Sequence, residues 1–122
     1  MSMNQPKLDV QNITINIAKD FTDSPGGRYR SDGSHSGEEF LEDLLRPRYD
    51  QAKMENKLLV IELDGVFGYP SSFVSGSFGV LSSECKKNGE DLLSRIKFVS
   101  SSPTRIDRFQ LEIKDPTQRE KL

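Results

Sequence analysis

The chain has 122 residues, of which 34% are hydrophobic and 30% are charged, and a formal net charge of −2. This length suits one domain, and the interspersed charges argue against a nucleic-acid-binding stripe. The single cysteine excludes an internal disulfide. With no apolar leader and no apolar run near the roughly 20 residues of a membrane span, the sequence predicts a cytoplasmic protein.

The N-terminal part is predicted to be a flexible arm over residues 1–7, followed by a domain over residues 8–114 and a frayed tail over residues 115–122. The first ordered element covers residues 8–21. Ile13, Ile15 and Ile17 alternate with polar residues there, which predicts a strand with one buried face.

Residues 22–37 form a loop that is rich in glycine and serine. Ser36 and Glu39 match a capping box and predict a helix that begins after Ser36. Pro47 should kink or interrupt this helix near Leu45 or Arg46.

Residues 57–63 read KLLVIEL, a short apolar run that predicts a central strand. A turn over residues 65–70 leads to a second helix, capped by Ser71 or Ser72 and ended by Gly89. Its predicted core stripe is Val74, Phe78, Leu81 and Cys85.

Residues 92–100 predict a third strand. Residues 105–114 fit either a helix, through Ile106, Phe109 and Ile113, or a strand, through Phe109, Leu111 and Ile113. The alternation of strands and helices predicts an α/β fold, a small layer of mixed β-sheet with crossover helices.

Small residues gather on one predicted face of the second helix. They are Ser72, Ser75, Gly76, Gly79 and Ser83. One interpretation is close packing of helix on sheet. The other is a docking face for a protein partner, for which the candidate residues are Ser71, Ser72, Ser75, Gly76 and Gly79.

Four features together carry a resemblance to a known family. They are Gly26-Gly27-Arg28, the run from Ser36 to Phe40, the apolar strand that ends in Asp64-Gly65, and the helix start from Ser71 to Gly79. In this combination the chain resembles a bacterial STAS-like domain of unknown function and, more distantly, anti-sigma factor antagonist domains. The resemblance covers roughly residues 13–89 and implies a STAS-like fold.

The resemblance also implies a candidate phosphorylation site. In antagonist domains the second serine of an Asp-Ser-Ser-Gly motif is phosphorylated by the anti-sigma factor kinase, and Ser72 matches that serine. Pro70 and Phe73 stand where the motif has Asp and Gly. From the residues alone, Ser72 is either this site or a plain helix cap.

The glycine- and arginine-containing loop is a candidate anion or partner site. Its residues are Gly26, Gly27, Arg28, Arg30 and Ser36. Backbone N–H groups, guanidinium groups and a helix start would converge on an anion. The alternative is an ordered surface loop in which Arg28 pairs with a carboxylate such as Asp32 or Asp64.

The residues do not favour catalysis, a metal or a cofactor. His35 is the single histidine, and a Ser72–His35–Asp32 triad has no motif behind it. Cys85 lies on the core stripe and should act as a small hydrophobe. Asp64, at a predicted strand end, is a candidate Mg²⁺ ligand.

The prediction is therefore a non-enzymatic regulatory module that binds a protein, and the resemblance points to a histidine-kinase-like ATPase as the partner. Two alternatives stay open. One is a small-molecule or nucleotide sensor that uses the Gly/Arg loop. The other is a non-catalytic assembly subunit, such as a homodimer formed through a sheet edge.

Overall fold

The structure is a computed structural model that describes residues 12–116. The predicted arm over residues 1–7, the start of the first element, and residues 117–122 of the predicted tail lie outside the described residues. Within the described residues, no helix combines the length and the apolar character that crossing a membrane would require.

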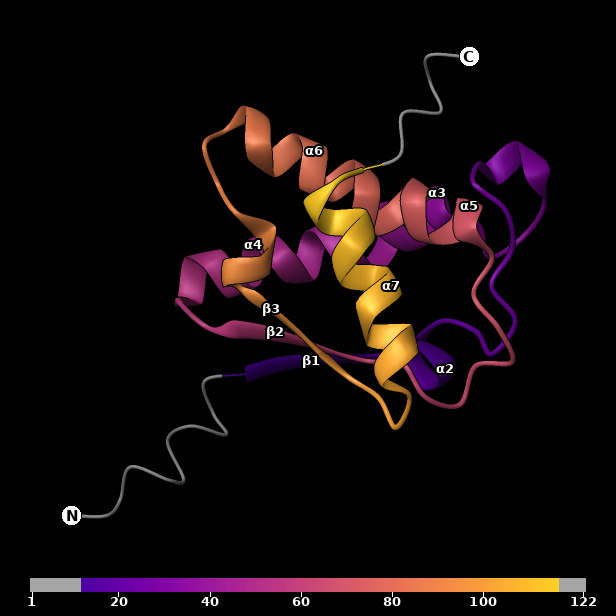
Figure 1. Ribbon diagram of the computed structural model, residues 1–122. Coiled ribbons are helices and arrows are strands. Elements are labelled where there is room, and N and C mark those ends of the chain that lie inside the picture. The colour runs from indigo at the N-terminus through magenta and orange to yellow at the C-terminus, as the bar shows by residue number, and fades with distance from the viewer. Residues whose placement is uncertain (1–11, 117–122) are drawn as a thin grey trace.

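Three parallel strands form the sheet, in the order β1 (Asn12–Asn16), β2 (Leu58–Glu62) and β3 (Ile96–Val99). Leu58–Glu62 is central, as its apolar run predicts. Ile15 pairs with Ile61, and Ile61 pairs with Phe98. The predicted α/β fold with crossover helices is confirmed (Figure 1). The sheet was predicted to be mixed, whereas the described strands are parallel throughout.

Two long helices cross over between the strands. The first long helix runs through α3 (Gly37–Phe40), a π-helical turn (Leu41–Leu45) and α4 (Arg46–Glu55). The second long helix runs through α5 (Ser71–Val74), another π-helical turn (Ser75–Gly79) and α6 (Val80–Lys87). The remaining helical elements are α2 (Ile17–Asp20), 3₁₀ turns at Arg30–Asp32 and Leu92–Ser94, and α7 (Pro103–Lys114).

The first strand is shorter than predicted, because it ends at Asn16 and Ile17 already begins a helical turn. The side chain of Asn16 accepts a hydrogen bond from the Lys19 N–H at 3.0 Å, which caps that turn. Ile17 is nevertheless fully buried. The apolar alternation therefore identified a buried residue but placed it in the wrong element.

Pro47 does not break the first long helix. The predicted irregularity near Leu45 appears instead as the π-helical turn that ends at Leu45, two residues before the proline. Proline lacks an N–H, and its ring crowds the carbonyl of the residue four positions earlier. A wider turn at this point lets the helix continue through the proline.

The start of the second long helix also differs from the prediction. Pro70 occupies the N-cap position and no side chain caps the helix, so neither Ser71 nor Ser72 is a cap. Ser71 is the first helical residue and Ser72 the second. At the other end, Gly89 follows the helix with a φ of +74°, as predicted for a helix stop.

The ambiguous segment over residues 105–114 is a helix. Ser102 caps it by accepting a hydrogen bond from the Arg105 N–H at 3.2 Å. Phe109 and Ile113 are buried, whereas Leu111 is 65% exposed. The helical spacing was therefore the correct one of the two.

An aromatic cluster forms the centre of the core. The Phe78 ring lies 5.8 Å from the Phe40 ring, 5.5 Å from Phe98 and 5.2 Å from Phe109, between centroids. All four residues of the predicted core stripe are buried, at Val74, Phe78, Leu81 and Cys85. This confirms the predicted inner face of the second long helix.

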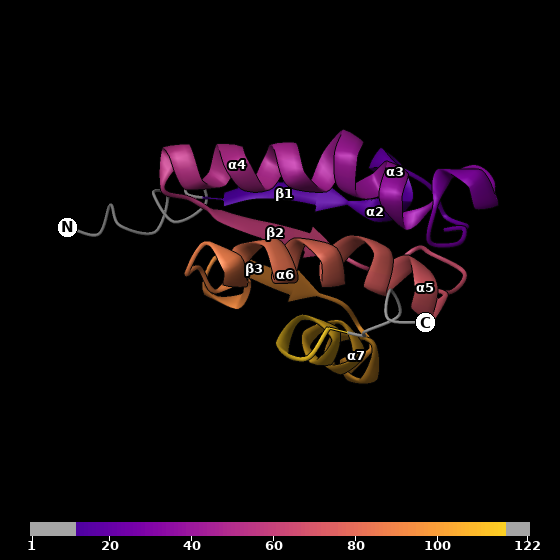
Figure 2. The same ribbon diagram turned by 90° about the horizontal axis from the view of Figure 1, so that it is seen from above.

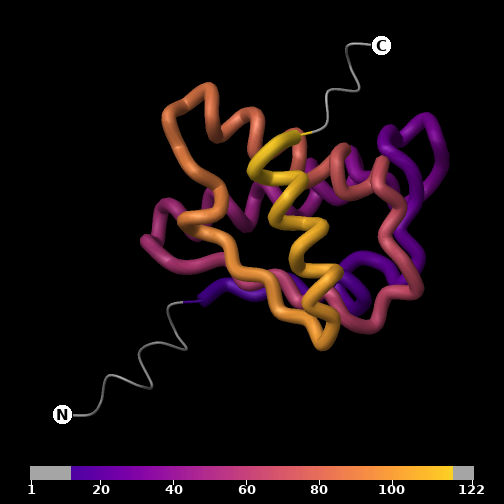
Figure 3. Tube along the Cα trace, in the orientation of Figure 1, coloured from indigo at the N-terminus to yellow at the C-terminus, as the bar shows by residue number. Residues whose placement is uncertain are grey.

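The helices lie on one face of the sheet (Figures 1 and 2). The chain trace in Figure 3 shows both crossovers and α7 on this same side. No helix of the described residues covers the opposite face, where Leu58 and Val99 are 41% and 43% exposed. The molecule therefore has two layers, and its core lies between the sheet and the helices.

Candidate functional site

The Gly/Arg loop caps the first long helix with its own backbone. The carbonyl of Gly27 accepts the Gly37 N–H at 2.8 Å, and that of Arg28 accepts the Glu38 N–H at 2.9 Å. Ser36 Oγ accepts the Glu39 N–H at 3.0 Å. These N–H groups of the helix start are thus occupied by acceptors of the chain itself. The prediction that they converge on an anion is therefore wrong for this conformation.

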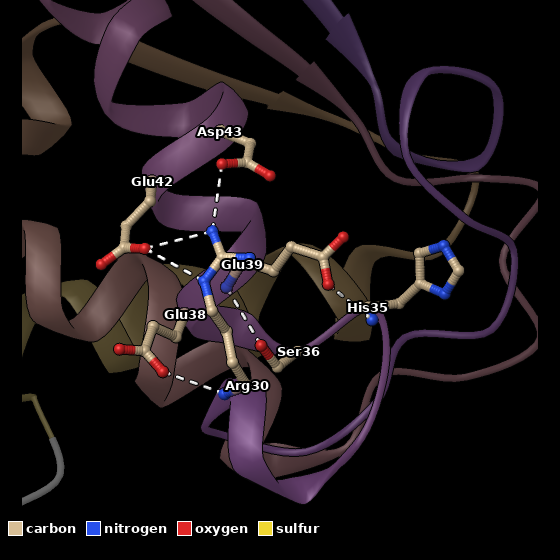
Figure 4. Close-up of polar contacts among 7 residues, drawn as sticks. All are labelled: Arg30, His35, Ser36, Glu38, Glu39, Glu42 and Asp43. Carbon is tan, nitrogen blue, oxygen red and sulfur yellow. Dashed lines mark hydrogen bonds and ion pairs between the residues drawn. The ribbon is translucent and has the colours of Figure 1, made fainter.

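The predicted capping box is half formed, as Figure 4 shows. Ser36 makes its bond to the Glu39 N–H, but the Glu39 carboxylate accepts the N–H of His35, at 2.9 Å, in place of that of Ser36. Ser36 is fully buried, because the loop folds over it. Its role is therefore to fix the loop on the helix.

The two arginines of the loop point to different places. Arg30 forms ion pairs with Glu42 and Asp43, each at 3.1 Å (Figure 4), and the hydrogen bond to Glu42 raises the pKa of Arg30. Arg28 instead donates a hydrogen bond to Ser75 Oγ in the second long helix. No carboxylate of residues 12–116 forms an ion pair with Arg28.

The two acidic residues considered as partners of Arg28 are engaged elsewhere. Asp32 accepts the Tyr29 N–H at 2.9 Å. Asp64 accepts Ser100 Oγ at 2.7 Å and the Ser101 N–H at 2.9 Å, and these bonds lower the pKa of Asp64. The ion pair considered for Arg28 is therefore not formed.

The small-residue face of the second long helix is largely covered by the chain itself. Ser75, Gly76 and Gly79 are buried. A Cβ at Gly76 would lie 3.0 Å from Cγ of Arg28, and a Cβ at Gly79 would lie 2.8 Å from the Glu112 carboxylate. These three positions serve close packing, so they are not open to a partner in this conformation.

The two long helices also touch through glycine. A Cβ at Gly37 would lie 2.6 Å from the Phe73 carbonyl oxygen and 3.1 Å from the backbone of Gly76. Glycine at position 37 therefore lets the start of the first long helix approach the second one directly. Of the two residues that open this helix, Ser36 caps it and Gly37 permits its close packing.

Beside this contact lies a cleft of about 430 Å³ between the two long helices, here called the interhelical cleft. One side comes from the first long helix, the other from the second, and Arg28 and Tyr29 contribute from the loop. Its lining residues are Arg28, Tyr29, Glu38, Leu41, Glu42, Arg46, Ser75, Gly76, Gly79, Val80, Ser83, Glu84, Lys87 and Pro116.

Both π-helical turns contribute residues to this cleft, Leu41 and Glu42 from one and Ser75, Gly76 and Gly79 from the other. The two turns also contact each other. Such turns occur frequently at functional sites. Sequence reasoning missed the residues of the first long helix, although Glu38, Glu42 and Arg46 share a spacing of four that places them on one helical edge.

A second candidate surface lies at the start of the second long helix. Ser71 is exposed and Ser72 is half-buried. Phe67, in the preceding turn, is 84% exposed, although its N–H donates to the Asp23 carbonyl at 2.9 Å. We call Phe67, Gly68, Pro70, Ser71 and Ser72 the helix-start surface. The sequence analysis missed Phe67. The available signal was a large apolar side chain in a predicted turn, between Gly65 and Gly68.

The residues considered for catalysis and metal binding have other contacts. The His35 ring packs edge-on against Phe21, with 5.2 Å between centroids. Cys85 is buried, and burial raises the pKa of its thiol. Among residues 12–116, no three His, Cys, Asp or Glu side chains group closely enough to hold a metal ion.

Comparison with protein-family models identifies the family of this chain. The family model for the STAS-like domain of unknown function (DUF4325) matches residues 36–105, which is more than half of the chain. The match begins at the serine that caps the first long helix and includes all of the second. No curated protein and no solved structure matches the chain. The chain belongs to the family of STAS-like domains of unknown function.

Proposed function

We propose that this STAS-like domain is a regulatory protein-binding module whose partner docks on the helix-start surface. The observation that carries the proposal is the exposure of Phe67, 84% of which is accessible on a turn that is tied to Asp23. Aromatic side chains bury a large apolar area, and Phe is among the residues that are enriched in the cores of protein–protein interfaces.

The position of the surface in the sheet supports the same proposal. The turn follows Leu58–Glu62, so it lies at the carboxyl ends of the parallel strands. Open α/β sheets commonly place their binding sites at this edge. The buried positions Ser75, Gly76 and Gly79 take no part, and Ser71 and Ser72 are the predicted partner-binding residues that remain accessible.

Ser72 is proposed as a phosphorylation switch on this surface. Within the described residues, no acceptor receives the N–H of Ser71 or Ser72. A phosphate at Ser72 would bring about −1.5 to −2 charges to these free N–H groups and to the positive end of the helix dipole. The fold would tolerate it, whereas a partner packed against Phe67 would meet a hydrated dianion.

The proposed partner class is a histidine-kinase-like ATPase of the anti-sigma type. It is taken from the resemblance to antagonist domains, in which such a kinase phosphorylates the matching serine. The test is affinity capture from the native cell, followed by binding measurements with the purified captured protein. Incubation of the purified pair with ATP and mass spectrometry then measure phosphorylation of Ser72.

Four variants make this test specific. Phe67→Ala and Ser72→Asp should each weaken binding at least about tenfold, which corresponds to about 1.4 kcal/mol. Ser72→Ala should bind as the wild type does but accept no phosphate. Thr104→Asp is the matched control, because Thr104 is the exposed second residue of α7 and its substitution adds the same charge at another helix start.

Stability measurements separate a lost partner from a lost fold. Since the side chain of Ser72 does not cap the helix, Ser72→Ala should change the free energy of unfolding by less than about 0.5 kcal/mol. Ser72→Asp should raise it by about 0.3–1 kcal/mol through the helix dipole. A folded Ser72→Asp variant that retains full partner binding would refute the switch.

A further inference from the structure

We propose that the interhelical cleft binds a small organic monoanion, a carboxylate or a singly charged phosphate ester, with an uncharged and partly apolar body. Arg28 holds the anionic group at the Ser75 end of the cleft. The body lies between Leu41 of the first long helix and Val80 and Ser83 of the second. This binding is a property of the isolated chain, so it is independent of the protein partner proposed above.

The first step of the argument is the state of Arg28. Its side chain is half-buried and lines the cleft, and its one hydrogen bond goes to the neutral hydroxyl of Ser75. A guanidinium group has five N–H donors, and its strongest partners are carboxylate and phosphate oxygens. Arg30, two residues away, has two carboxylate partners. Arg28 forms no ion pair with a carboxylate of residues 12–116.

The second step is the charge of the cleft. Six of its lining residues are charged, and they are Arg28, Glu38, Glu42, Arg46, Glu84 and Lys87. Arg46 pairs with Glu84 at 2.6 Å, and Glu42 pairs with Arg30 from outside the cleft. Three of the six are positive and three are negative, so the lining is neutral overall, and Arg30 divides its charge between Glu42 and Asp43. Arg28, which donates to Ser75, pairs with no carboxylate of residues 12–116, so it can balance one negative charge but not a di- or triphosphate.

The third step is the shape of the cleft. A volume of about 430 Å³ lies in the range of sites for small organic molecules. Leu41 and Val80 provide apolar contact and Ser83 provides a hydroxyl, whereas Gly76 and Gly79 are packed against Arg28 and Glu112 and contribute only backbone to the lining. Such a lining suits a flat or apolar body more than a chain of charged groups.

The test uses probes that share one ring and differ in charge. Phenylacetate and methyl phenyl phosphate carry the two candidate anionic groups, phenylacetamide is neutral, and phenethylamine is cationic. Each is titrated into the ¹⁵N-labelled full chain, and backbone amide shifts are followed by NMR. At least one anion should give saturable shifts at Ser75, Gly76 and Gly79, with an affinity at least about tenfold above that of the amide and the amine. Comparison of the two anions identifies the preferred head group.

Three variants locate the binding. Arg28→Gln removes the charge but keeps the side-chain stem over Gly76, so it should weaken the preferred anion at least about tenfold. Arg48→Gln removes an exposed arginine of α4 that neither lines the cleft nor pairs with a residue that does, so it should bind as the wild type does. Ser83→Phe fills the cleft from a half-exposed position and should abolish binding, and it provides the test if Arg28→Gln does not fold.

Three results would overturn the proposed anion site. Equal affinity for the anions and for phenylacetamide would mean that Arg28 does not select charge. Saturable shifts that survive both Arg28→Gln and Ser83→Phe would place the binding elsewhere. Absence of saturable shifts with both anions would also overturn the proposal.

Discussion

Replacement of Phe78 by alanine tests the packing at the centre of the molecule. Phe78 is fully buried, and its ring contacts those of Phe40, Phe98 and Phe109. These partners come from the first long helix, the sheet and α7, so one side chain joins three parts of the fold. The substitution therefore leaves a cavity that no single element can close by shifting.

The expected loss is about 3–5 kcal/mol, the usual cost of a buried Phe→Ala change. A domain of this size has about 5–15 kcal/mol of stability in total. At about 4 °C per kcal/mol, the melting temperature should fall by roughly 12–20 °C. Thermal and urea unfolding followed by circular dichroism give both quantities.

Phe67→Ala is the matched control, because it removes the same side chain from a position that is 84% exposed. Its free energy of unfolding should change by less than about 0.5 kcal/mol. If Phe78→Ala melted like the wild type, Phe78 would lie outside the core and the register of the second long helix would be wrong.

Three further predictions concern other parts of the chain. Leu63→Ala should cost about 2–5 kcal/mol in urea unfolding, since Leu63 is fully buried; a loss below about 1 kcal/mol would contradict that burial. Trypsin should cleave the Gly/Arg loop first, and after Arg30 before Arg28, because Arg28 is half-buried against Ser75; mass spectrometry of early fragments decides this, and first cleavage within residues 57–63 or 73–85 would contradict the fold. Asp64 has a lowered pKa in the folded chain, so its contribution to stability is present above its ordinary value of 3.8 and is lost as the pH falls through the folded value. Asp64→Asn should therefore destabilise the chain at pH 7 and make a smaller difference near pH 3, and an equal difference at both pH values would refute this.

Features that depend on nearby residues could be predicted from the sequence. The apolar run of the central strand, the Ser36 cap and the spacing of Val74, Phe78, Leu81 and Cys85 each express a local period or a local bond. All three are present in the structure. Ile17 shows the limit, because its burial followed the pattern while its backbone followed the capping bond of Asn16.

Features that depend on tertiary contact could not be predicted in this way. Arg28 meets Ser75 across 47 positions of the chain, and no local pattern distinguishes it from Arg30. The backbone of the Gly/Arg loop caps a helix that begins ten residues after Gly27, which occupies the N–H groups that an anion would need. The interhelical cleft likewise depends on how the two long helices pack against each other, and no periodic pattern in the sequence reports that packing.

The one-sided arrangement of the helices constrains how this fold can grow. The strands follow one another across the sheet in chain order, and right-handed crossovers that advance in one direction place every helix on the same face. A further strand added beyond β3 in the same order would therefore add its helix to the covered side. Only a reversal of direction, with a strand added beyond β1, would bring a crossover helix under Leu58 and Val99. In topological terms the described sheet is singly wound, and a doubly wound sheet would require a change in strand order, whatever the amino acids on the open face.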